Sequence, residues 1–207
     1  KEFQRLGVLG DFNNYYSTMS FEAEAQIVRE LGKFLLDGSL YQGFKPVFWS
    51  TVEKTALADA EVEYKDHTSN TIFVAFKVKE TKKDFLKNSN IVIWTTTPWT
   101  IPANKALAFN SGIDYSLIEI SDLENFKETK IVVANNLLES IIKSCNIEKF
   151  KVLKTFKGSE FLGTICSHPF LKLGYDYDVP MLDARFVNLE QGTGIVHCAP
   201  SHGPDDF

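Results

Sequence analysis

Apolar side chains recur at helical spacing in one segment near the start of the chain. Every third or fourth position is apolar there, at Phe21, Ala25, Val28, Leu31 and Leu35. Either Thr18 or Ser20 can cap the first turn, where Glu22 and Glu24 suit the positive end of the helix dipole. Gly38 provides a stop signal. The pattern therefore predicts an amphipathic helix that ends before Gly38.

Downstream of this helix the apolar period changes to two, which is the spacing of a strand with one exposed face. Residues 58–64 alternate apolar side chains with Asp59, Glu61 and Glu63, and residues 71–79 alternate in the same way. A short helix is predicted at residues 135–144. Further strands are predicted at residues 46–49, 91–94, 115–120, 131–134, 150–156, about 162–166, 177–181 and 194–197.

Many short strands with few helices favour a mixed α/β (α+β) fold with a β-barrel-like core of short strands and peripheral helices. We expect one domain over residues 1–207. Residues 1 to about 60 would form a helical and extended segment packed on the barrel. Residues from about 61 to 207 would form the barrel core and carry any site.

The charge balance and the cysteines narrow the class of protein. The chain has 207 residues with 22 Lys and Arg against 27 Asp and Glu, a net charge of −5. Because a nucleic-acid-binding domain normally presents clustered positive charge, RNA contacts should be local unless a larger protein holds the RNA.

Three cysteines without metal-type spacing indicate reduced thiols in a cytoplasmic protein. No apolar run is long enough for a membrane span. The start at Lys1 rather than Met indicates a fragment of a longer polypeptide.

The first stretch with candidate chemistry is residues 94–104, where an apolar strand gives way to a loop fixed by Pro98 and Pro102. Its polar and aromatic members are Trp94, Thr95, Thr96, Thr97, Trp99, Thr100 and Asn104. Threonine hydroxyls donate and accept hydrogen bonds, so they suit a ribose hydroxyl, a carbonyl or a water, but they are not strong bases. A threonine-rich strand end without a function is the alternative.

The second stretch is residues 192–207, in which glycines precede a short apolar strand, and two histidines and two aspartates follow. Asp205 or Asp206 could cap a following helix. A metal site formed by His197, His202 and Asp206 is a further alternative, although no common ligand spacing supports it. A His197–Cys198 dyad is disfavoured, because neighbouring side chains on a strand point to opposite faces.

These two stretches, read as "TTTPWT…PAN" and "GTGIVHCAPSHGPDDF", resemble the editing insertion of isoleucyl-tRNA synthetases. The segments "RLGVLGDF…Y…TM", "KPVFWS" and "ALADAEVEY" extend the resemblance to nearly the whole chain. Valyl and leucyl relatives usually carry Arg after two threonines in the first motif and lack His in the second. Thr97 and His197 stand at those places, which favours the isoleucyl branch. Ser50 and Glu53 replace cysteines found in many relatives, so no zinc site is expected there.

The resemblance implies a role for each site residue. Thr95, Thr96, Thr97 and Asp206 would be the catalytic set, with the threonines orienting ester and water and the carboxylate of Asp206 holding the α-ammonium group. His197 would form a wall of the amino-acid pocket so that valine enters and isoleucine does not; a role as general base is the alternative for this residue. Trp94 would shape the pocket or contact the terminal adenosine. Thr100 would bind the substrate with the other threonines, orienting the ester, the terminal ribose hydroxyl and the attacking water. Asn104 would support the loop or the substrate.

The implied activity is hydrolysis of valine from valine-charged isoleucine tRNA, and of valyl-adenylate as a further substrate class. The partners would be the 3′ end of the tRNA, the valine moiety and the rest of a parent synthetase, with a monomeric state and no membrane. The His-x-Gly-His and Lys-Met-Ser-Lys-Ser motifs of the synthetic site are absent. ATP and Mg²⁺ are therefore expected only in the parent enzyme, and no cofactor or metal in this chain. Alternatives from other classes are a non-catalytic RNA-binding or interaction module and a metal-dependent hydrolase.

Overall fold

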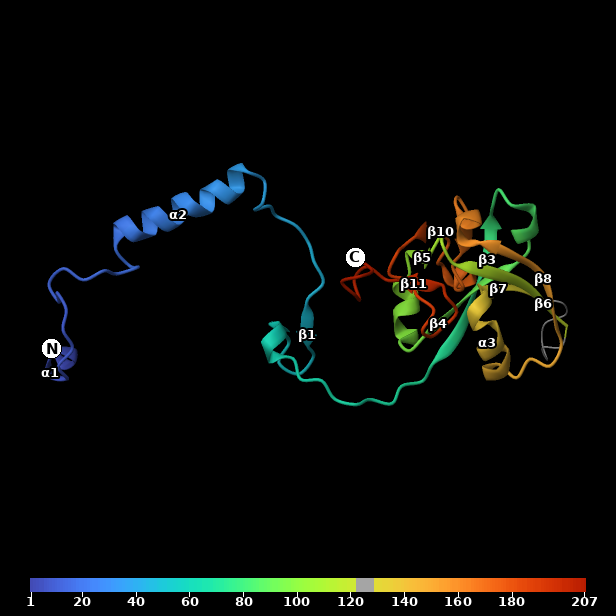
Figure 1. The fold of residues 1–207 in the computed structure, drawn as a ribbon, viewed down its shortest axis with the longest axis horizontal. Coiled ribbons are helices and arrows are strands. Elements are labelled where there is room, and N and C mark those ends of the chain that lie inside the picture. The colour runs from blue at the N-terminus through green and yellow to red at the C-terminus, as the bar shows by residue number, and fades with distance from the viewer. Residues whose placement is uncertain (122–128) are drawn as a thin grey trace. The chain divides into compact units, whose positions relative to one another are not determined.

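The computed structural model describes residues 1–121 and 129–207, which divide into two compact units, Lys1–Phe44 and Lys45–Phe207 (Figure 1). The first unit contains two helices, α1 (Glu2–Arg5) and α2 (Phe21–Leu36). The predicted boundary near residue 60 stays a prediction. No helix within the described ranges has the length and apolar character that crossing a bilayer requires.

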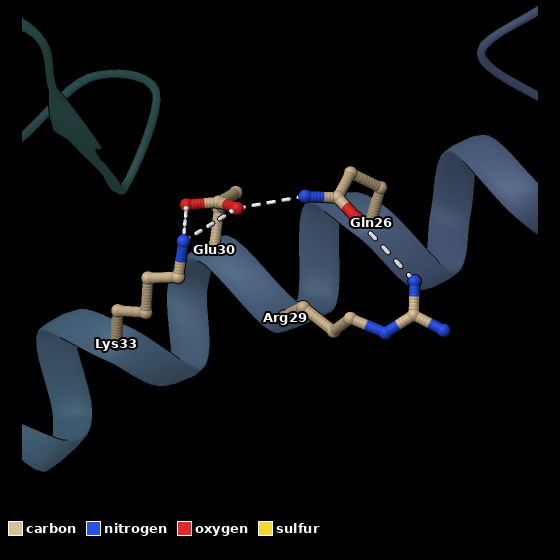
Figure 2. Close-up of polar contacts among 4 residues, drawn as sticks. All are labelled: Gln26, Arg29, Glu30 and Lys33. Carbon is tan, nitrogen blue, oxygen red and sulfur yellow. Dashed lines mark hydrogen bonds and ion pairs between the residues drawn. The ribbon is translucent and has the colours of Figure 1, made fainter.

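Helix α2 confirms the helical pattern, with Ser20 as its N-cap. The Ser20 side chain accepts a hydrogen bond from the Ala23 N–H at 3.3 Å, which satisfies one of the unpaired donors of the first turn. On one exposed side, Glu30 accepts from Gln26 Nε2 at 2.7 Å and pairs with Lys33 at 2.7 Å (Figure 2). These pairs are three and four residues apart, the spacing at which helical side chains meet.

The second unit begins with a two-stranded antiparallel sheet formed by β1 (Phe48–Ser50) and β2 (Thr55–Leu57). A nine-stranded sheet follows in the order β11-β5-β10-β9-β3-β4-β7-β6-β8. Its strands are β3 (Ile72–Glu80), β4 (Asn90–Thr95), β5 (Ala106–Phe109), β6 (Asp114–Ile120), β7 (Thr129–Ala134), β8 (Phe150–Lys157), β9 (Ile165–Ser167), β10 (Asp178–Asp183) and β11 (Val196–Cys198). Among the strand pairs formed by residues 1–121 and 129–207, the β10–β5 and β4–β7 pairs are parallel and the others are antiparallel.

Short helices precede and connect the strands of this sheet. The α-helix is α3 (Leu138–Ser144). The 3₁₀ helices are η1 (Asp59–Glu61), η2 (Asp84–Leu86), η3 (Pro98–Ala103), η4 (Asn135–Leu137), η5 (Gly158–Phe161) and η6 (Leu171–Leu173). Helix α3 packs Leu138 and Ile141 against one face of β4, β6 and β7.

The sheet coils around its main core, so that strands far apart in the sheet order contact each other. Tyr115 on β6 is fully buried and donates its hydroxyl to the Gly194 carbonyl, just before β11, at 2.8 Å. Phe85 in η2, on the connection between β3 and β4, lies 4.9 Å from Phe156 on β8, measured between ring centroids. The predicted mixed α/β fold is confirmed, with a large β-sheet and a few helices.

The observed elements differ from the sequence expectations at residues 58–64 and at β2 and β5, two strands that were not predicted. Residues 58–64 were expected to form a strand but contain η1, where Glu61 accepts the Ala58 N–H at 2.8 Å. This local side-chain bond replaces sheet pairing, and alanine offers little surface for packing on a sheet. Strand β5 was not expected. It is four residues long and buried on both faces, so its apolar run shows no alternation.

Candidate active site

The two motifs meet because β11 pairs with β5. The Thr-rich stretch leaves β4, turns through η3 and returns as β5, and β11 lies antiparallel to β5 with His197 opposite Leu107. A cavity of about 330 Å³ opens at this junction. It is lined by Trp94, Thr95, Thr96, Thr97, Thr100, Phe186, Asn188, Gln191, Gly192, Thr193, Gly194, Ile195, Val196, His197, Ala199, His202 and Asp206. The structure thus gathers every sequence-predicted site residue except Asn104, which lies behind the cavity wall.

The threonines form a connected hydroxyl cluster. The Thr95 hydroxyl accepts the Thr97 N–H at 3.1 Å and lies 3.3 Å from the Thr97 hydroxyl. The Thr100 hydroxyl donates to the Thr97 carbonyl at 2.8 Å. Thr96 lines the cavity with its side chain exposed. The cluster offers neutral donors and acceptors on one wall, and none of them is a strong base.

His197 is a buried wall residue with both ring nitrogens engaged. It is only 8% exposed, and its Nε2 lies 2.9 Å from the Thr100 hydroxyl. The Asn104 amide nitrogen lies 3.3 Å from its Nδ1. Burial lowers the pKa of His197, and the nearby charge of Asp206 only partly opposes this. His197 is therefore neutral at physiological pH.

Asp206 brings a carboxylate to the cavity. One carboxylate oxygen, Oδ2, accepts a hydrogen bond from the Ala199 N–H at 2.9 Å, which holds the side chain against the end of β11. The residue is half-buried and lines the cavity together with His197. A carboxylate in such a place attracts a cationic group.

The segment before β11 supplies a wall that the sequence analysis missed. Phe186, Asn188 and Gln191 line the cavity just upstream of the Gly-Thr-Gly motif. Their position within six residues of Gly192 was the available signal. Gly194 shapes this wall, because its φ is +72° and a Cβ there would lie 2.4 Å from the Ala134 Cβ. Only glycine permits this backbone to approach β7 so closely.

The arrangement offers no ready metal centre within residues 1–121 and 129–207. No group of three His, Cys, Asp or Glu side chains lies close enough there to hold a metal ion. His197, His202 and Asp206 all line the cavity but do not form such a group. The metal-hydrolase alternative thus lacks a ligand set among these residues.

The comparison with protein families identifies the class of protein to which this coiled mixed sheet belongs. Residues 1–183 match the family model described as tRNA synthetases class I (I, L, M and V), and the chain belongs to this family. Within the family it is similar to isoleucine–tRNA ligases. It is 71% identical over 206 residues to that of Pelagibacter ubique (strain HTCC1062) and 48% identical over 213 residues to that of Gluconobacter oxydans (strain 621H).

Both matches cover 100% of this chain but only 23% and 22% of the two relatives, so the chain spans less than a quarter of their length. Among solved structures, the P. knowlesi cytosolic leucyl-tRNA synthetase editing domain is similar at a TM-score of 0.51 and 16% identity. That match covers 66% of this chain and 58% of that one. At this identity the likeness shows a shared fold. The resemblance to the isoleucyl-tRNA synthetase insertion is confirmed.

Proposed function

We propose that this chain is an editing hydrolase that releases valine from isoleucine tRNA and spares isoleucine on the same tRNA. One observation carries the proposal: threonine hydroxyls, a buried neutral imidazole and a carboxylate converge on a single cavity. An aminoacyl ester presents a carbonyl, a small apolar side chain and an ammonium group. Each wall of the cavity has a chemical counterpart among these three.

A hydrolytic site separate from the synthetic site overcomes a physical limit on how well one binding pocket can distinguish two amino acids. One methylene in an apolar pocket is worth only about 1–3 kcal/mol, a general limit for which this enzyme class is itself the standard example. A site that accepts valine and excludes the larger isoleucine relies instead on steric exclusion. Overfilling a close-packed pocket costs more than leaving it slightly empty.

Asp206 is assigned to the α-ammonium group of the amino acid. Its carboxylate is tied to the Ala199 N–H through Oδ2 and stands at the cavity. A charge-assisted hydrogen bond to an ammonium group fixes the amino acid at one end. The ester carbonyl is then directed toward the threonine wall.

The threonine cluster is assigned to water positioning and to stabilisation of the oxyanion. A water oxygen attacks the ester carbonyl carbon, the bond from that carbon to the ribose oxygen breaks, and the ribose oxygen takes up the proton. Free valine and an intact tRNA end leave. Orientation supplies much of such a rate enhancement because aminoacyl esters are already reactive, and hydroxyl donors at the developing oxyanion add to it.

His197 is assigned to the side-chain wall rather than to proton transfer. A general base needs a free nitrogen lone pair directed at the attacking water. Nδ1 faces the Asn104 amide nitrogen, and Nε2 faces the Thr100 hydroxyl. This occupancy favours a steric role and disfavours the rival assignment as base. The proposal needs neither cofactor nor metal in this chain, with ATP and Mg²⁺ assigned to the synthetic site of a parent enzyme.

The experiment that tests the proposal measures free valine released from valine-charged isoleucine tRNA, with and without a chelator. Release above the spontaneous rate that the chelator leaves unchanged is the expected result. Release that stops with chelator and returns with zinc would support a metal-dependent hydrolase instead. Binding of the tRNA without release, by this chain and by a full-length relative containing it, would support a non-catalytic module.

A further inference from the structure

The rear of the Thr-rich turn is held by side chains from a distant segment, residues 168–177. His168 Nε2 lies 3.0 Å from the Ile101 carbonyl in η3. The Tyr177 hydroxyl donates to the Asn104 carbonyl at 2.7 Å. Pro98 and Pro102 interrupt regular pairing of this backbone. These two hydrogen bonds therefore tie the Thr-rich turn to residues 168–177.

The donors are themselves fixed by an aromatic cluster. His168 is 1% exposed and stacks on Tyr175 with ring centroids 4.7 Å apart. Its Nδ1 accepts the Phe170 N–H at 3.1 Å, so its proton is on Nε2 and points at the carbonyl. The Tyr177 ring lies 5.3 Å from the His168 ring and carries the Lys105 ammonium 4.2 Å from its centroid. The Tyr177 hydroxyl is thus presented by a rigid platform.

Asn104 links the Tyr177 hydroxyl to His197. Its amide nitrogen donates to the Ala106 carbonyl at 2.9 Å and lies 3.3 Å from His197 Nδ1. Because a carbonyl only accepts, the nitrogen and not the oxygen of the amide must face Ala106. An N–H group then points at Nδ1, which must be unprotonated. The proton of His197 is consequently on Nε2, where it donates to the Thr100 hydroxyl at 2.9 Å.

The Asn104 amide is held in this orientation although its oxygen gains nothing from it. Asn104 is fully buried, and its Oδ1 has no hydrogen-bond partner among the described residues. Buried polar atoms rarely remain unpaired unless the surrounding structure imposes it. Here the backbone on either side is fixed, by Tyr177 at the Asn104 carbonyl and by strand β5 from Ala106.

We propose that Tyr177 is a positioning residue: its hydroxyl holds the Asn104 carbonyl and, through the Asn104 amide, fixes His197 as a pocket wall with one ring orientation and one tautomer. Without the hydroxyl, Asn104 can shift, and the imidazole gains freedom to rotate or to move its proton to Nδ1. The wall that excludes the larger amino acid then becomes less well defined. The activity readout of this inference rests on the proposed editing function, whereas the imidazole readout does not.

The test compares Tyr177→Phe with Tyr175→Phe in the 207-residue chain, using nitrogen NMR of labelled histidines at neutral pH. His197→Gln identifies the His197 signals. The wild type should show one neutral tautomer protonated at Nε2, and Tyr177→Phe should show tautomer exchange. Tyr175→Phe is the matched control. Tyr175 joins the same cluster through its ring, and its hydroxyl makes no hydrogen bond within the described part of the chain.

The second readout is the ratio of valine to isoleucine release from charged tRNA. Tyr177→Phe should lower this ratio roughly 2- to 10-fold, the range of one neutral hydrogen bond, and Tyr175→Phe should not. A His197 protonated at Nδ1 in the wild type would overturn the inference without any variant. The inference would also be overturned if Tyr177→Phe lowered the melting temperature but left the His197 tautomer and the ratio of valine to isoleucine release unchanged. A tautomer change in Tyr177→Phe alone, with no deacylation by any of the proteins, would support the inference and contradict the proposed function.

Discussion

At the scale of single residues, His197 decides between two accounts of the chemistry. A ring with both nitrogens in hydrogen bonds to neighbouring side chains is suited to exclude volume, whereas a general base needs one nitrogen directed at water. The two accounts therefore predict opposite outcomes when the imidazole is removed.

Replacing His197 with Ala should preserve valine release and open the pocket to isoleucine. Release of isoleucine should rise roughly 10- to 200-fold, the range that one methylene of fit corresponds to. His197→Gln keeps a side chain of similar length at the wall and should still exclude isoleucine. Measured rates of release from both charged tRNAs check this. Loss of all hydrolysis in His197→Ala, with an unchanged melting temperature, would restore the imidazole as the base.

Asp206→Ala should weaken editing through loss of the ammonium contact. A hydrogen bond to a charged group is worth about 1.5–3 kcal/mol, so kcat/KM for valine release should fall roughly 10- to 150-fold. Asp205→Ala removes the neighbouring exposed carboxylate and serves as the control. Equal effects of both substitutions on kcat/KM would contradict the assignment of the anchor to Asp206.

At the scale of elements, the turn before β11 depends on glycine for two separable reasons. Gly192 and Gly194 both have positive φ, at +83° and +72°. A Cβ at Gly192 would meet the Trp94 ring at an ordinary 3.5 Å, but one at Gly194 would lie 2.4 Å from the Ala134 Cβ. Gly194 thus carries a steric restriction that Gly192 lacks.

Gly194→Ala should therefore destabilise the second unit more than Gly192→Ala. Forcing extra volume into a packed contact typically costs about 1–3 kcal/mol in addition to backbone strain. Chemical unfolding of the two variants measures the difference in free energy of unfolding. Equal losses would mean that β7 moves aside and that the close approach does not fix the cavity wall.

A strand with an alternating pattern and a helix with clear capping could be predicted from sequence, and β3 and α2 confirm this. Strand predictions from sequence patterns were wrong or missing where a local hydrogen bond or tertiary packing decides the structure. Strand β5 is too short and too uniformly apolar to identify. Residues 58–64 alternate like a strand, yet a side-chain hydrogen bond from Glu61 closes a turn there.

The candidate site could likewise be predicted only in part. Its polar residues were predicted because the two motifs are long and resemble a known family, and residues 94–97 and 197 do face one cavity. The support behind it could not be predicted. Tyr177 contacts Asn104 across 73 positions of sequence, and nothing in the local pattern around either residue indicates that contact. Which strand pairs with β5 is a tertiary fact of the same kind.

At the scale of the whole molecule, buried neutral histidines link folding to pH. Burial lowers the pKa of both His168 and His197 below the usual value. In the unfolded chain each titrates near pH 6.5. Below that pH the unfolded state binds more protons than the folded state. Stability is therefore fully present above about pH 6.5 and is lost as the pH falls.

The free energy of unfolding should thus decrease between about pH 7 and pH 5.5, a window in which ordinary carboxylates do not titrate. Chemical unfolding at several pH values measures the slope. His197→Gln should flatten it, because one of the two groups is removed. A wild-type stability that is constant across this window would contradict the neutral buried state of both rings.

The whole account depends on selection by size in the cavity between η3 and β11. Because the chain spans less than a quarter of its isoleucine–tRNA ligase relatives, the decisive measurement is made on the chain alone and on a full-length relative containing it. Isoleucine tRNA charged with valine or with isoleucine is mixed with excess protein, and release of each amino acid is followed in a single turnover. The account predicts release of valine well above the spontaneous rate while isoleucine stays attached. Equal release of both amino acids, or faster release of isoleucine, would contradict it.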